Sequence, residues 1–234
     1  MSKQVDIAIG LVSYNTRELV ERCLTSILEY THGVTYQIIL VDNASKDGTA
    51  EMVKNQFPSV KLIHSPKNVG FPSAINMALE QSTARYFAMF NSDTALLNDT
   101  FTELVQFADA HPECGIVCPQ LYYPDGEIQV SHFPFRDPKK RAYREVSPRI
   151  HELKQVLSIS KPKAKKADKP REVPGAPIEI QRPRGVCFVI RKECVDDIGP
   201  MDGNFFIFAE DVDWAWRAKL AGWKRYLVPS AKLM

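Results

Sequence analysis

Short apolar runs alternate with amphipathic stretches through the first part of the chain. The apolar runs are rich in aliphatic and aromatic residues, as strands buried on both faces are, and occupy residues 5–12, 37–41, 60–64 and 86–90. The stretches between them repeat apolar residues at helical spacing and occupy residues 17–30, 50–57 and 73–81. Because strand and helix alternate, the pattern predicts an α/β fold on a mostly parallel sheet with right-handed crossovers.

Elements predicted further along the chain make the sheet mixed. A helix is predicted at residues 99–110, with Asn98 as its N-cap, and a strand at 115–121. Turn formers at 124–126 predict that residues 128–131 pair back as a hairpin. The remaining elements are a strand at 185–190, a helix at 191–198, a helix from about Glu210 to Gly222, and a strand at 223–228 before Pro229.

Residues 133–182 interrupt this pattern. They contain seven prolines, and the lysine-rich part at 161–170 has almost no apolar side chain to bury. We expect a basic, proline-rich insertion, much of it mobile, with a short helix at 150–159. The chain is therefore predicted to be a single domain, residues 1–234, that carries this insertion.

Composition places the chain among ordinary globular proteins. It has 234 residues, of which 44% are hydrophobic and 25% charged. No apolar segment is long enough to span a bilayer, and the first residues lack the apolar core of a signal peptide, so a cytoplasmic location is predicted. The five cysteines are scattered without zinc-site spacing, which indicates reduced, mostly buried residues.

The formal charge of +2 conceals a strong asymmetry. Residues 136–171 hold 13 Lys and Arg against 4 Asp and Glu, a local balance of +9 that leaves −7 for the rest. Such a segment is compatible with a solvated insertion, with attraction to an anionic membrane surface or a phosphate-bearing acceptor, or with nucleic acid.

Carboxylates stand at the ends of predicted strands and at the start of one helix. Asp42 and Asp47 follow one strand and Asp93 another, while Glu210, Asp211 and Asp213 open the helix near residue 210. Each group also has a structural explanation, as turn formers, as caps, or as charges at a helix N-terminus. Carboxylates that meet at the carboxyl edge of a sheet suit metal-assisted displacement, in which one holds a cation and another takes a proton.

Other catalytic classes lack their sequence patterns here. No glycine-rich dinucleotide fingerprint follows the first strand, and no phosphate-loop Gly-Lys-Ser/Thr pattern occurs. No nucleophile elbow and no Cys/His pair is recognisable. A nicotinamide-dependent dehydrogenase, a phosphate-loop nucleotidase and a nucleophilic hydrolase are therefore disfavoured.

Five blocks in the same order as in one enzyme family give the chain a specific resemblance. They are Val12-Ser13-Tyr14-Asn15, the stretch 41–49, Asn68-Val69-Gly70-Phe71 through Asn76, Phe90-Asn91-Ser92-Asp93, and residues 206–223. The sequence resembles an inverting family 2 glycosyltransferase of the GT-A fold, close to the rhamnosyltransferase-like group. The resemblance implies a Rossmann-like α/β/α sandwich with a mostly parallel, mixed central sheet.

The resemblance also implies roles for individual residues. Asp211 corresponds to the catalytic base of the family's Glu-Asp motif, and Asp93 to the last acidic residue of the metal-binding DxD motif. Asp93 is thus expected to hold Mg2+ or Mn2+ against the donor diphosphate, with Asn91 in place of the motif's first carboxylate. The other expected donor and nucleotide contacts are Ser13, Tyr14, Asn15, Asp42, Asn68, Gly70, Asn76, Asn91, Ser92 and Glu210.

The implied reaction moves a sugar from a nucleotide-diphosphate sugar, a UDP- or dTDP-sugar, to a hydroxyl of a saccharide or lipid-linked acceptor. It would serve polysaccharide or glycoconjugate biosynthesis, with no nucleic acid partner. The helix N-terminus would lower the pKa of Asp211, while Phe208 and Trp214 would raise it by desolvation, and the sequence leaves open which is larger.

One departure from the family favours an alternative. The family commonly has a histidine just after its final strand, and this chain stops at Met234, so the matching position is absent and truncation is expected. A non-catalytic nucleotide-sugar-binding or assembly module is therefore the second hypothesis. A third is that residues 136–171 make peripheral contact with a membrane that carries the acceptor.

Overall fold

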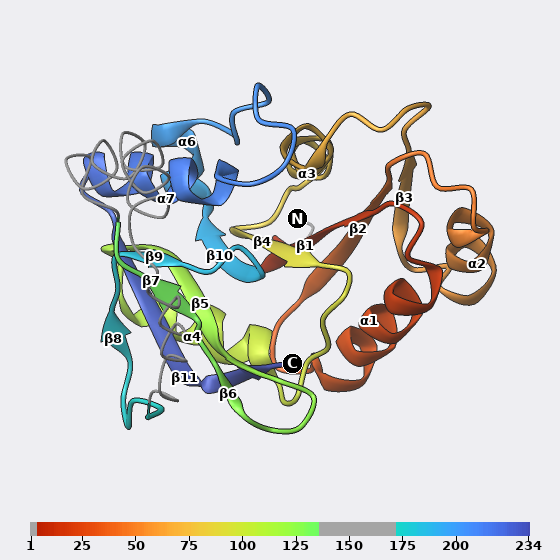
Figure 1. Cartoon of the computed structure of the whole chain (residues 1–234). Helices are drawn as coiled ribbons and strands as arrows, with labels where there is room; N and C mark the ends of the chain where they lie inside the picture. Colours follow the sequence, from red (N-terminus) through yellow and green to blue (C-terminus); the bar gives the residue numbers. More distant parts are fainter. Residues whose placement is uncertain (1–3, 136–171) are drawn as a thin grey trace, which may run out of the picture.

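A nine-stranded mixed sheet organises the part of the chain that the structure describes. The computed structural model describes residues 4–135 and 172–234. The basic segment 136–171, with the helix predicted at 150–159, lies outside the described residues, so its expected mobility and membrane contact stay predictions. The sheet order is β3-β2-β1-β4-β10-β5-β11-β8 (Figure 1).

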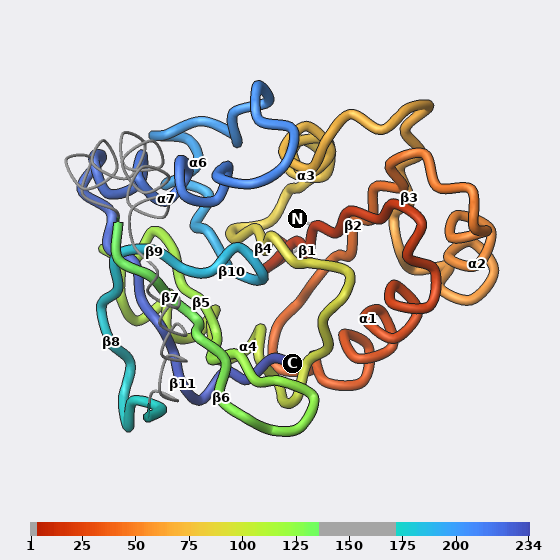
Figure 2. The backbone as a smooth tube through the Cα atoms, viewed as in Figure 1, coloured from red at the N-terminus to blue at the C-terminus, as the bar shows by residue number. Residues whose placement is uncertain are grey.

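Four parallel strands form one half of the sheet, as the alternation of strand and helix predicts. They are β1 (Ile7–Ser13), β2 (Tyr36–Asp42), β3 (Lys61–His64) and β4 (Tyr86–Asn91). The backbone tube shows the N-terminal segments on one side of the molecule and the green-to-blue segments on the other, meeting where β4 pairs with β10 (Figure 2).

The other half of the sheet is mixed. β10 (Cys187–Arg191) runs antiparallel between β4 and β5 (Cys114–Tyr122), and β11 (Lys224–Leu233) runs parallel to β5. The predicted hairpin is present, because β6 (Ile128–Gln129) pairs antiparallel with β5. The prediction of a mostly parallel, mixed sheet is therefore confirmed.

Helices cover both faces of the sheet and give three layers. One core holds apolar residues from α1 (Arg17–Tyr30), α2 (Thr49–Gln56) and α4 (Thr100–Ala110). The other holds residues from α3 (Phe71–Glu80), α6 (Lys192–Ile198) and α7 (Glu210–Leu220), which lie above the sheet in Figure 1. Neighbouring strand residues alternate between the two cores: Ile7 and Ile9 pack in the first and Ala8 in the second.

The buried residues agree with the expectations from composition. All five cysteines are buried and free, so they act as small apolar side chains. Within residues 4–135 and 172–234, no helix combines the length and the apolarity that crossing a bilayer requires.

Two predicted details are wrong. Asp99, and not Asn98, is the N-cap of α4, because the Asn98 amide instead bonds the backbone of Ser230 and Lys232 on β11. The last strand does not end before Pro229 but continues to Leu233, since an irregularity between Val228 and Lys232 lets the strand pass the proline.

Regular structure also extends into both ends of the predicted insertion. β7 (His132–Phe133) pairs with β9 (Arg182–Pro183), so the two flanks of the insertion lie side by side. β8 (Ile178–Glu179) joins the main sheet beside β11. Regular structure therefore resumes before Gly185, which is where the sequence pattern predicted that it would resume.

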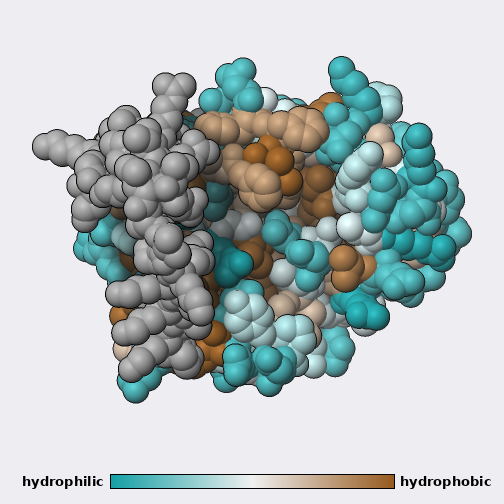
Figure 3. All heavy atoms as spheres, in the orientation of Figure 1, coloured by the Kyte–Doolittle hydropathy of each residue, from teal (hydrophilic) through white to brown (hydrophobic). Residues whose placement is uncertain are grey.

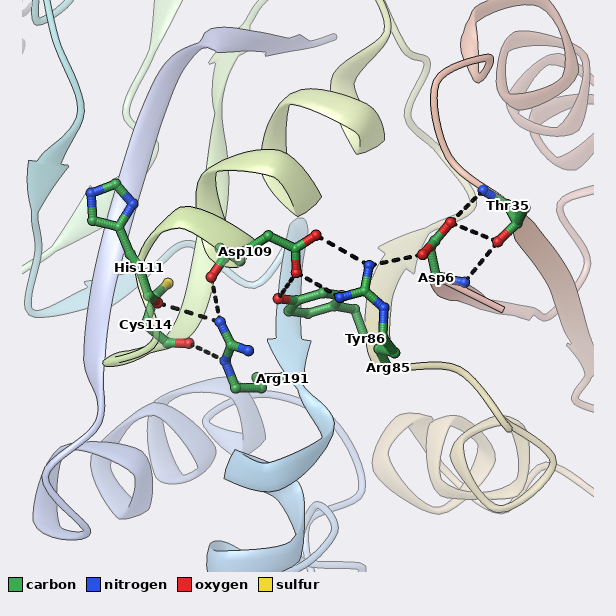
Figure 4. Close-up of polar contacts among 9 residues, drawn as sticks. Asp6, Thr35, Arg85, Tyr86, Asp109, His111, Cys114 and Arg191 are labelled. Atoms are coloured by element: carbon green, nitrogen blue, oxygen red, sulfur yellow. Dashed lines mark hydrogen bonds and ion pairs between the residues drawn. The ribbon is translucent and has the colours of Figure 1, made fainter. Parts of the chain in front are cut away.

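A polar network closes the edge of the sheet where β1 and β4 begin (Figure 4). The Arg85 guanidinium donates to Asp109 at 2.6 and 3.1 Å and to Asp6 at 2.8 Å, and the Tyr86 hydroxyl donates to Asp109 at 2.8 Å. Arg191 at the end of β10 donates to main-chain carbonyls of Ala108, His111 and Cys114. The network joins β1, β4, β10 and β5 to the end of α4.

Candidate active site

The predicted site residues lie at the opposite edge of the sheet. β1, β2 and β4 are parallel, and their ends are in register: Ser13 lies beside Asp42, and Val12 beside Asn91. Asp93 lies two residues after the end of β4. Ligands bind at this carboxyl edge in open α/β sheets, so Asp42 and Asp93 share the edge that the sequence predicts.

Asp42 is buried and contacts one exposed histidine. Its Oδ1 accepts the Ser45 N–H at 3.2 Å, and its Oδ2 lies 3.1 Å from Nδ1 of His64. The Asp42 side chain is 1% exposed and that of His64 is 62% exposed. The His64 ring is therefore the exposed member of this pair, and the Asp42 carboxylate is covered.

The loop after β1 combines one exposed aromatic ring with structural polar groups. Tyr14 is half exposed, while Ser13 is buried with its hydroxyl 3.1 Å from that of Thr16. Asn15 has a φ of 54° and accepts the Lys46 N–H at 2.8 Å, which ties this loop to the loop after β2. Tyr14 is thus the residue of the three that is free to stack on a ligand.

Asp47 accepts hydrogen bonds at the start of two helices, although Gly48 is the N-cap of α2, the helix that Asp47 was expected to cap. Its Oδ1 accepts the N–H and the hydroxyl of Thr49 at the start of α2, and its Oδ2 accepts the N–H of Arg17 at the start of α1. Burial is the largest single effect on the pKa of Asp47 and raises it, but the hydrogen bonds from Thr49 and Arg17 together outweigh burial and lower the pKa.

The loop that enters α3 is held by Asn43, which the sequence reasoning did not select. Its amide donates to Asn68 at 2.9 Å, and its Oδ1 accepts the N–H of Val69 at 3.0 Å. Gly70 has a φ of 83°, and a Cβ there would lie 2.7 Å from the carbonyl oxygen of Phe206. Glycine is therefore required where this loop meets the segment before α7.

Asn76 extends the same connection. Its amide donates to the carbonyl of Met201 at 2.8 Å and accepts the Met201 N–H at 3.0 Å. Both polar ends of the side chain are thus used by the backbone that leads to residues 206–208. Ligand contact by Asn76 stays a prediction.

The residues after β4 face in different directions. Ser92 is buried and donates to the carbonyl of Val12 at 3.0 Å, which fastens β4 to β1. Asn91 donates from Nδ2 to the carbonyl of Gly185 at 3.3 Å. Asp93 is exposed, so its carboxylate is the group of this motif that a ligand reaches.

Asp211 lies in the first turn of α7, partly buried against Gly185. A Cβ on Gly185 would lie 2.5 Å from Oδ2 of Asp211. Burial raises the pKa of Asp211, while the N–H of Val212, the charge of Arg182 and the N–H of Gly185 lower it by smaller amounts. The competition that the sequence leaves open is therefore won by desolvation, which makes the carboxylate a stronger base.

Glu210, next to Asp211, is buried inside the packing of α7. Its side chain is 7% exposed, and within the described residues its Oε2 has no hydrogen-bond partner. Burial, followed by the charge of Asp211, raises the pKa of Glu210. Donor contact by Glu210 stays a prediction.

An apolar segment precedes α7. Phe206, Ile207 and Phe208 are 60%, 54% and 79% exposed. Phe208 and Ala209 have φ values of 71° and 74°, a conformation that is costly for residues other than glycine. Figure 3 shows apolar residues gathered on the surface over α3 and the segment before α7.

The described residues offer a metal one free carboxylate at this edge. Among residues 4–135 and 172–234, no three His, Cys, Asp or Glu side chains cluster in a way that could hold a metal ion. Mg2+ is commonly bound by one or two carboxylates together with substrate phosphates, so exposed Asp93 fits that mode with a bound diphosphate. Asn91 faces Gly185 instead.

Sequence reasoning found the carboxylates but missed their partners. Asp42 and Asp93 were predicted from strand ends alone, whereas His64, Asn43 and Gly185 act through contacts far apart in the chain. The register of β2 with β3, which pairs Asp42 with His64, is the signal that could have identified the histidine. Gly185 has no local signal beyond its place before a strand.

The fold of this chain is similar to that of solved glycosyltransferase structures. A mannosyltransferase of Pyrobaculum calidifontis, in complex with GDP-mannose and Mn2+, matches 99% of the chain with a TM-score of 0.65 and 17% identity. GalNAc-T7 with UDP, GalNAc and Mn2+ matches all of it with a TM-score of 0.67 and 14% identity. The chain spans 57% and 44% of those two chains. The fold is that of GT-A glycosyltransferases, as predicted.

The chain belongs to glycosyl transferase family 2, whose family model matches residues 8–162. It is 26% identical to an N-acetylglucosaminyl-diphospho-decaprenol L-rhamnosyltransferase of Mycobacterium tuberculosis, over 97% of this chain and 75% of that protein. It is 29% identical to the succinoglycan biosynthesis protein ExoO of Rhizobium meliloti, over 47% of this chain and 32% of that protein. The predicted family is thereby confirmed, and the protein is a glycosyltransferase.

Proposed function

We propose that this glycosyltransferase moves a sugar from a nucleotide-diphosphate sugar to an acceptor hydroxyl, with inversion, and that Asp211 is the general base. The observation that carries the proposal is Asp211 itself. It is a partly buried carboxylate with a raised pKa, next to the edge where β1, β2 and β4 end. A base needs a pKa near the working pH, and burial moves Asp211 in that direction.

In the proposed step Asp211 accepts the proton of the acceptor hydroxyl. The hydroxyl oxygen forms a bond to the anomeric carbon on the face opposite the diphosphate. The bond between the anomeric carbon and the phosphate oxygen breaks, and its electron pair leaves with the nucleoside diphosphate. The configuration inverts because a single displacement occurs, and the proton remains on Asp211 until solvent removes it.

The donor is proposed to lie along the ends of β1, β2 and β4. Half-exposed Tyr14 and the Asp42–His64 pair are suited to the nucleoside of a UDP- or dTDP-sugar. Asp93 would hold Mg2+ or Mn2+ beside the diphosphate. When bound, the metal neutralises charge that develops on the leaving group.

The acceptor is proposed to be a saccharide on a lipid carrier, in polysaccharide or glycoconjugate biosynthesis. The names of the mycobacterial and rhizobial relatives support this substrate class. Exposed Phe206, Ile207 and Phe208 offer an apolar surface three residues from Asp211, where the aliphatic part of such a carrier could be shielded from water. The cytoplasmic location expected from the sequence stays a prediction.

A ligand screen followed by one variant tests the proposed function. We expect UDP or dTDP with Mn2+ to raise the melting temperature. At a ligand concentration a hundredfold above Kd, the folded state should gain roughly 2.7 kcal/mol of stability. D211N should bind the same nucleotide with unchanged affinity and lose transfer. A general base contributes about 10²- to 10⁴-fold to the rate. The kcat of D211N should therefore be lower than that of the wild type by about this factor or more.

The outcomes separate the two hypotheses. Transfer from one donor that depends on Asp211 establishes the proposed reaction. Nucleotide binding without turnover of any donor favours the non-catalytic binding module. Unchanged turnover in D211N removes Asp211 from the chemistry, and no stabilisation by any nucleotide with or without Mn2+ contradicts both functions.

A further inference from the structure

Gly185 lies between the end of β4 and the first turn of α7. It comes just before β10, which runs antiparallel to β4 and pairs Cys187 with Phe90. This pairing extends one step further, because the N–H of Asn91 donates to the carbonyl of Val186 at 3.0 Å. The backbone at Gly185 is therefore held at the same edge as the Asn91-Ser92-Asp93 motif.

The Asn91 side chain adds a second contact to this backbone. Its Nδ2 donates to the carbonyl oxygen of Gly185 at 3.3 Å. A carbonyl oxygen only accepts hydrogen bonds, so the contact requires a donor at position 91. An amide meets that requirement, whereas an ionised carboxylate, the group that the DxD pattern has there, would face the carbonyl without a proton and repel it.

The other side of Gly185 faces Asp211. A Cβ on Gly185 would lie 2.5, 2.8 and 3.0 Å from Oδ2, Cγ and Cβ of Asp211. No side chain fits at position 185, and the Gly185 N–H is among the groups that stabilise the Asp211 carboxylate. The other charged groups that act on Asp211 are Arg182 and Glu210. Displacing the Gly185 backbone would therefore move the carboxylate.

We propose that Asn91 is a positioning residue for Asp211, acting through the backbone of Gly185, and that it is not a metal ligand. The amide in the Asn-Ser-Asp motif is then a functional requirement and not a weakened form of an acidic motif. This inference rests on the proposed role of Asp211. In the Asn91-Ser92-Asp93 motif, Asn91 would then position the general base, while Asp93 would bind the metal at the donor diphosphate.

The variant N91D distinguishes positioning from metal binding. A ligand at position 91 would gain charge in N91D, so Mn2+ affinity and turnover would hold or rise. A positioning amide would lose its hydrogen bond. We then expect kcat to fall about ten- to a hundredfold, since small misplacements of a catalytic group have effects of that size. Donor KM should stay unchanged, and so should Mn2+ affinity measured with UDP or dTDP.

N91A and G185A separate a positioning role from damage to the fold. Both should lower kcat at constant donor KM, with a melting temperature that keeps the protein folded at the assay temperature. Displacement of the Gly185 N–H from the Asp211 carboxylate weakens a hydrogen bond that lowers the pKa of Asp211. The acidic limb of the kcat profile should therefore move to higher pH. D93N is the matched control, and it should weaken Mn2+ binding and leave that limb in place.

Two results would overturn the inference. The first is an N91D protein with higher Mn2+ affinity and wild-type or better turnover. The second is an acidic limb that stays in place in both N91A and G185A. If D211N itself retains turnover, the proposed base is wrong, and the Mn2+ titration of N91D still reports separately whether Asn91 binds metal.

Discussion

Asp211, the proposed general base, illustrates at the scale of one residue how burying a carboxylate opposes stability. Burial raises its pKa more than its hydrogen bonds and Arg182 lower it. A group whose pKa is raised by folding gives stability that is complete below its unfolded pKa and is lost as the pH rises through its folded pKa. At neutral pH the ionised Asp211 therefore costs folding free energy.

D211N is therefore expected to be more stable than the wild type at neutral pH. Asparagine removes the ionisation but keeps an oxygen that can accept the Gly185 N–H. The gain in melting temperature should be clear at pH 7–8 and should vanish below the ordinary aspartate pKa of 3.8. Calorimetric scans of both proteins across this pH range measure the effect.

Asp213, two residues further along α7, is the control. It accepts a hydrogen bond from Arg217 at 2.8 Å, and Arg217 also binds carbonyls at residues 198–200. D213N should therefore lower the melting temperature at neutral pH. A D211N protein that is less stable than the wild type at pH 7–8 would show that burying the ionised Asp211 carboxylate does not destabilise the folded state.

At the scale of elements, periodicity identified the helices and strands and failed where distant contacts decide. Helix α1 spans Arg17–Tyr30 as predicted, because its apolar face repeats at helical spacing. Asn98 looked like a cap, but it bonds to β11, more than a hundred residues away. Pro229 looked like a strand end, but the irregularity beside it keeps the pairing with β5. Local patterns contain neither contact.

The candidate site divides in the same way. Asp42 and Asp93 were predictable because parallel strands end at one edge of a sheet, a rule that needs only sequence order. Asp211 was assigned by resemblance, and its environment depends on Gly185, 26 positions earlier in the chain. His64 is an exposed residue whose ring contacts Asp42, and no local pattern indicates that contact. The sequence does not show which side chains from different loops contact one another.

The segment before α7 leads to a prediction about the acceptor. I207S and F208S should raise KM for a lipid-linked acceptor, by about tenfold if one large apolar side chain is shielded on binding. KM for the donor, and for the same acceptor without its lipid, should not change. Steady-state kinetics with the paired acceptors measures the difference.

Leu220 provides the matched control for this segment. It is 69% exposed at the other end of α7, so L220S removes a comparable exposed side chain away from Asp211. L220S should have wild-type KM values for both acceptors. Equal KM values for the lipid-linked acceptor in wild type, I207S and F208S would exclude this segment as an acceptor contact.

Across the whole molecule, the two edges of the sheet have different tasks. The edge where β1, β2 and β4 end holds Asp42, exposed Asp93 and Asp211, whose pKa is raised by burial. The edge where β1 and β4 begin holds the Arg85 network, in which polar groups bind one another (Figure 4). The same strands connect both edges. The hydrogen bonds of the Arg85 network can therefore stabilise the sheet at one edge, while the other edge holds groups such as Asp211 that destabilise the folded state.

This division predicts that D109N is destabilised but catalytically normal. The substitution removes the charge that the Arg85 guanidinium and the Tyr86 hydroxyl both contact. We expect a loss of about 1–2 kcal/mol, reduced from the value for buried pairs because Arg85 and Asp109 are partly exposed. That corresponds to about 2–4 °C in melting temperature per kcal/mol for a domain of this size.

The catalytic constants decide whether the edges are independent. Below its melting transition D109N should keep the wild-type kcat and donor KM, since the network lies a full strand length from Asp93 and Asp211. D196N, which breaks an exposed pair with Lys192 on α6, should leave both stability and kinetics unchanged. A fall in kcat for folded D109N, without the same fall in D196N, would show that the network also orients the strands that support the catalytic edge.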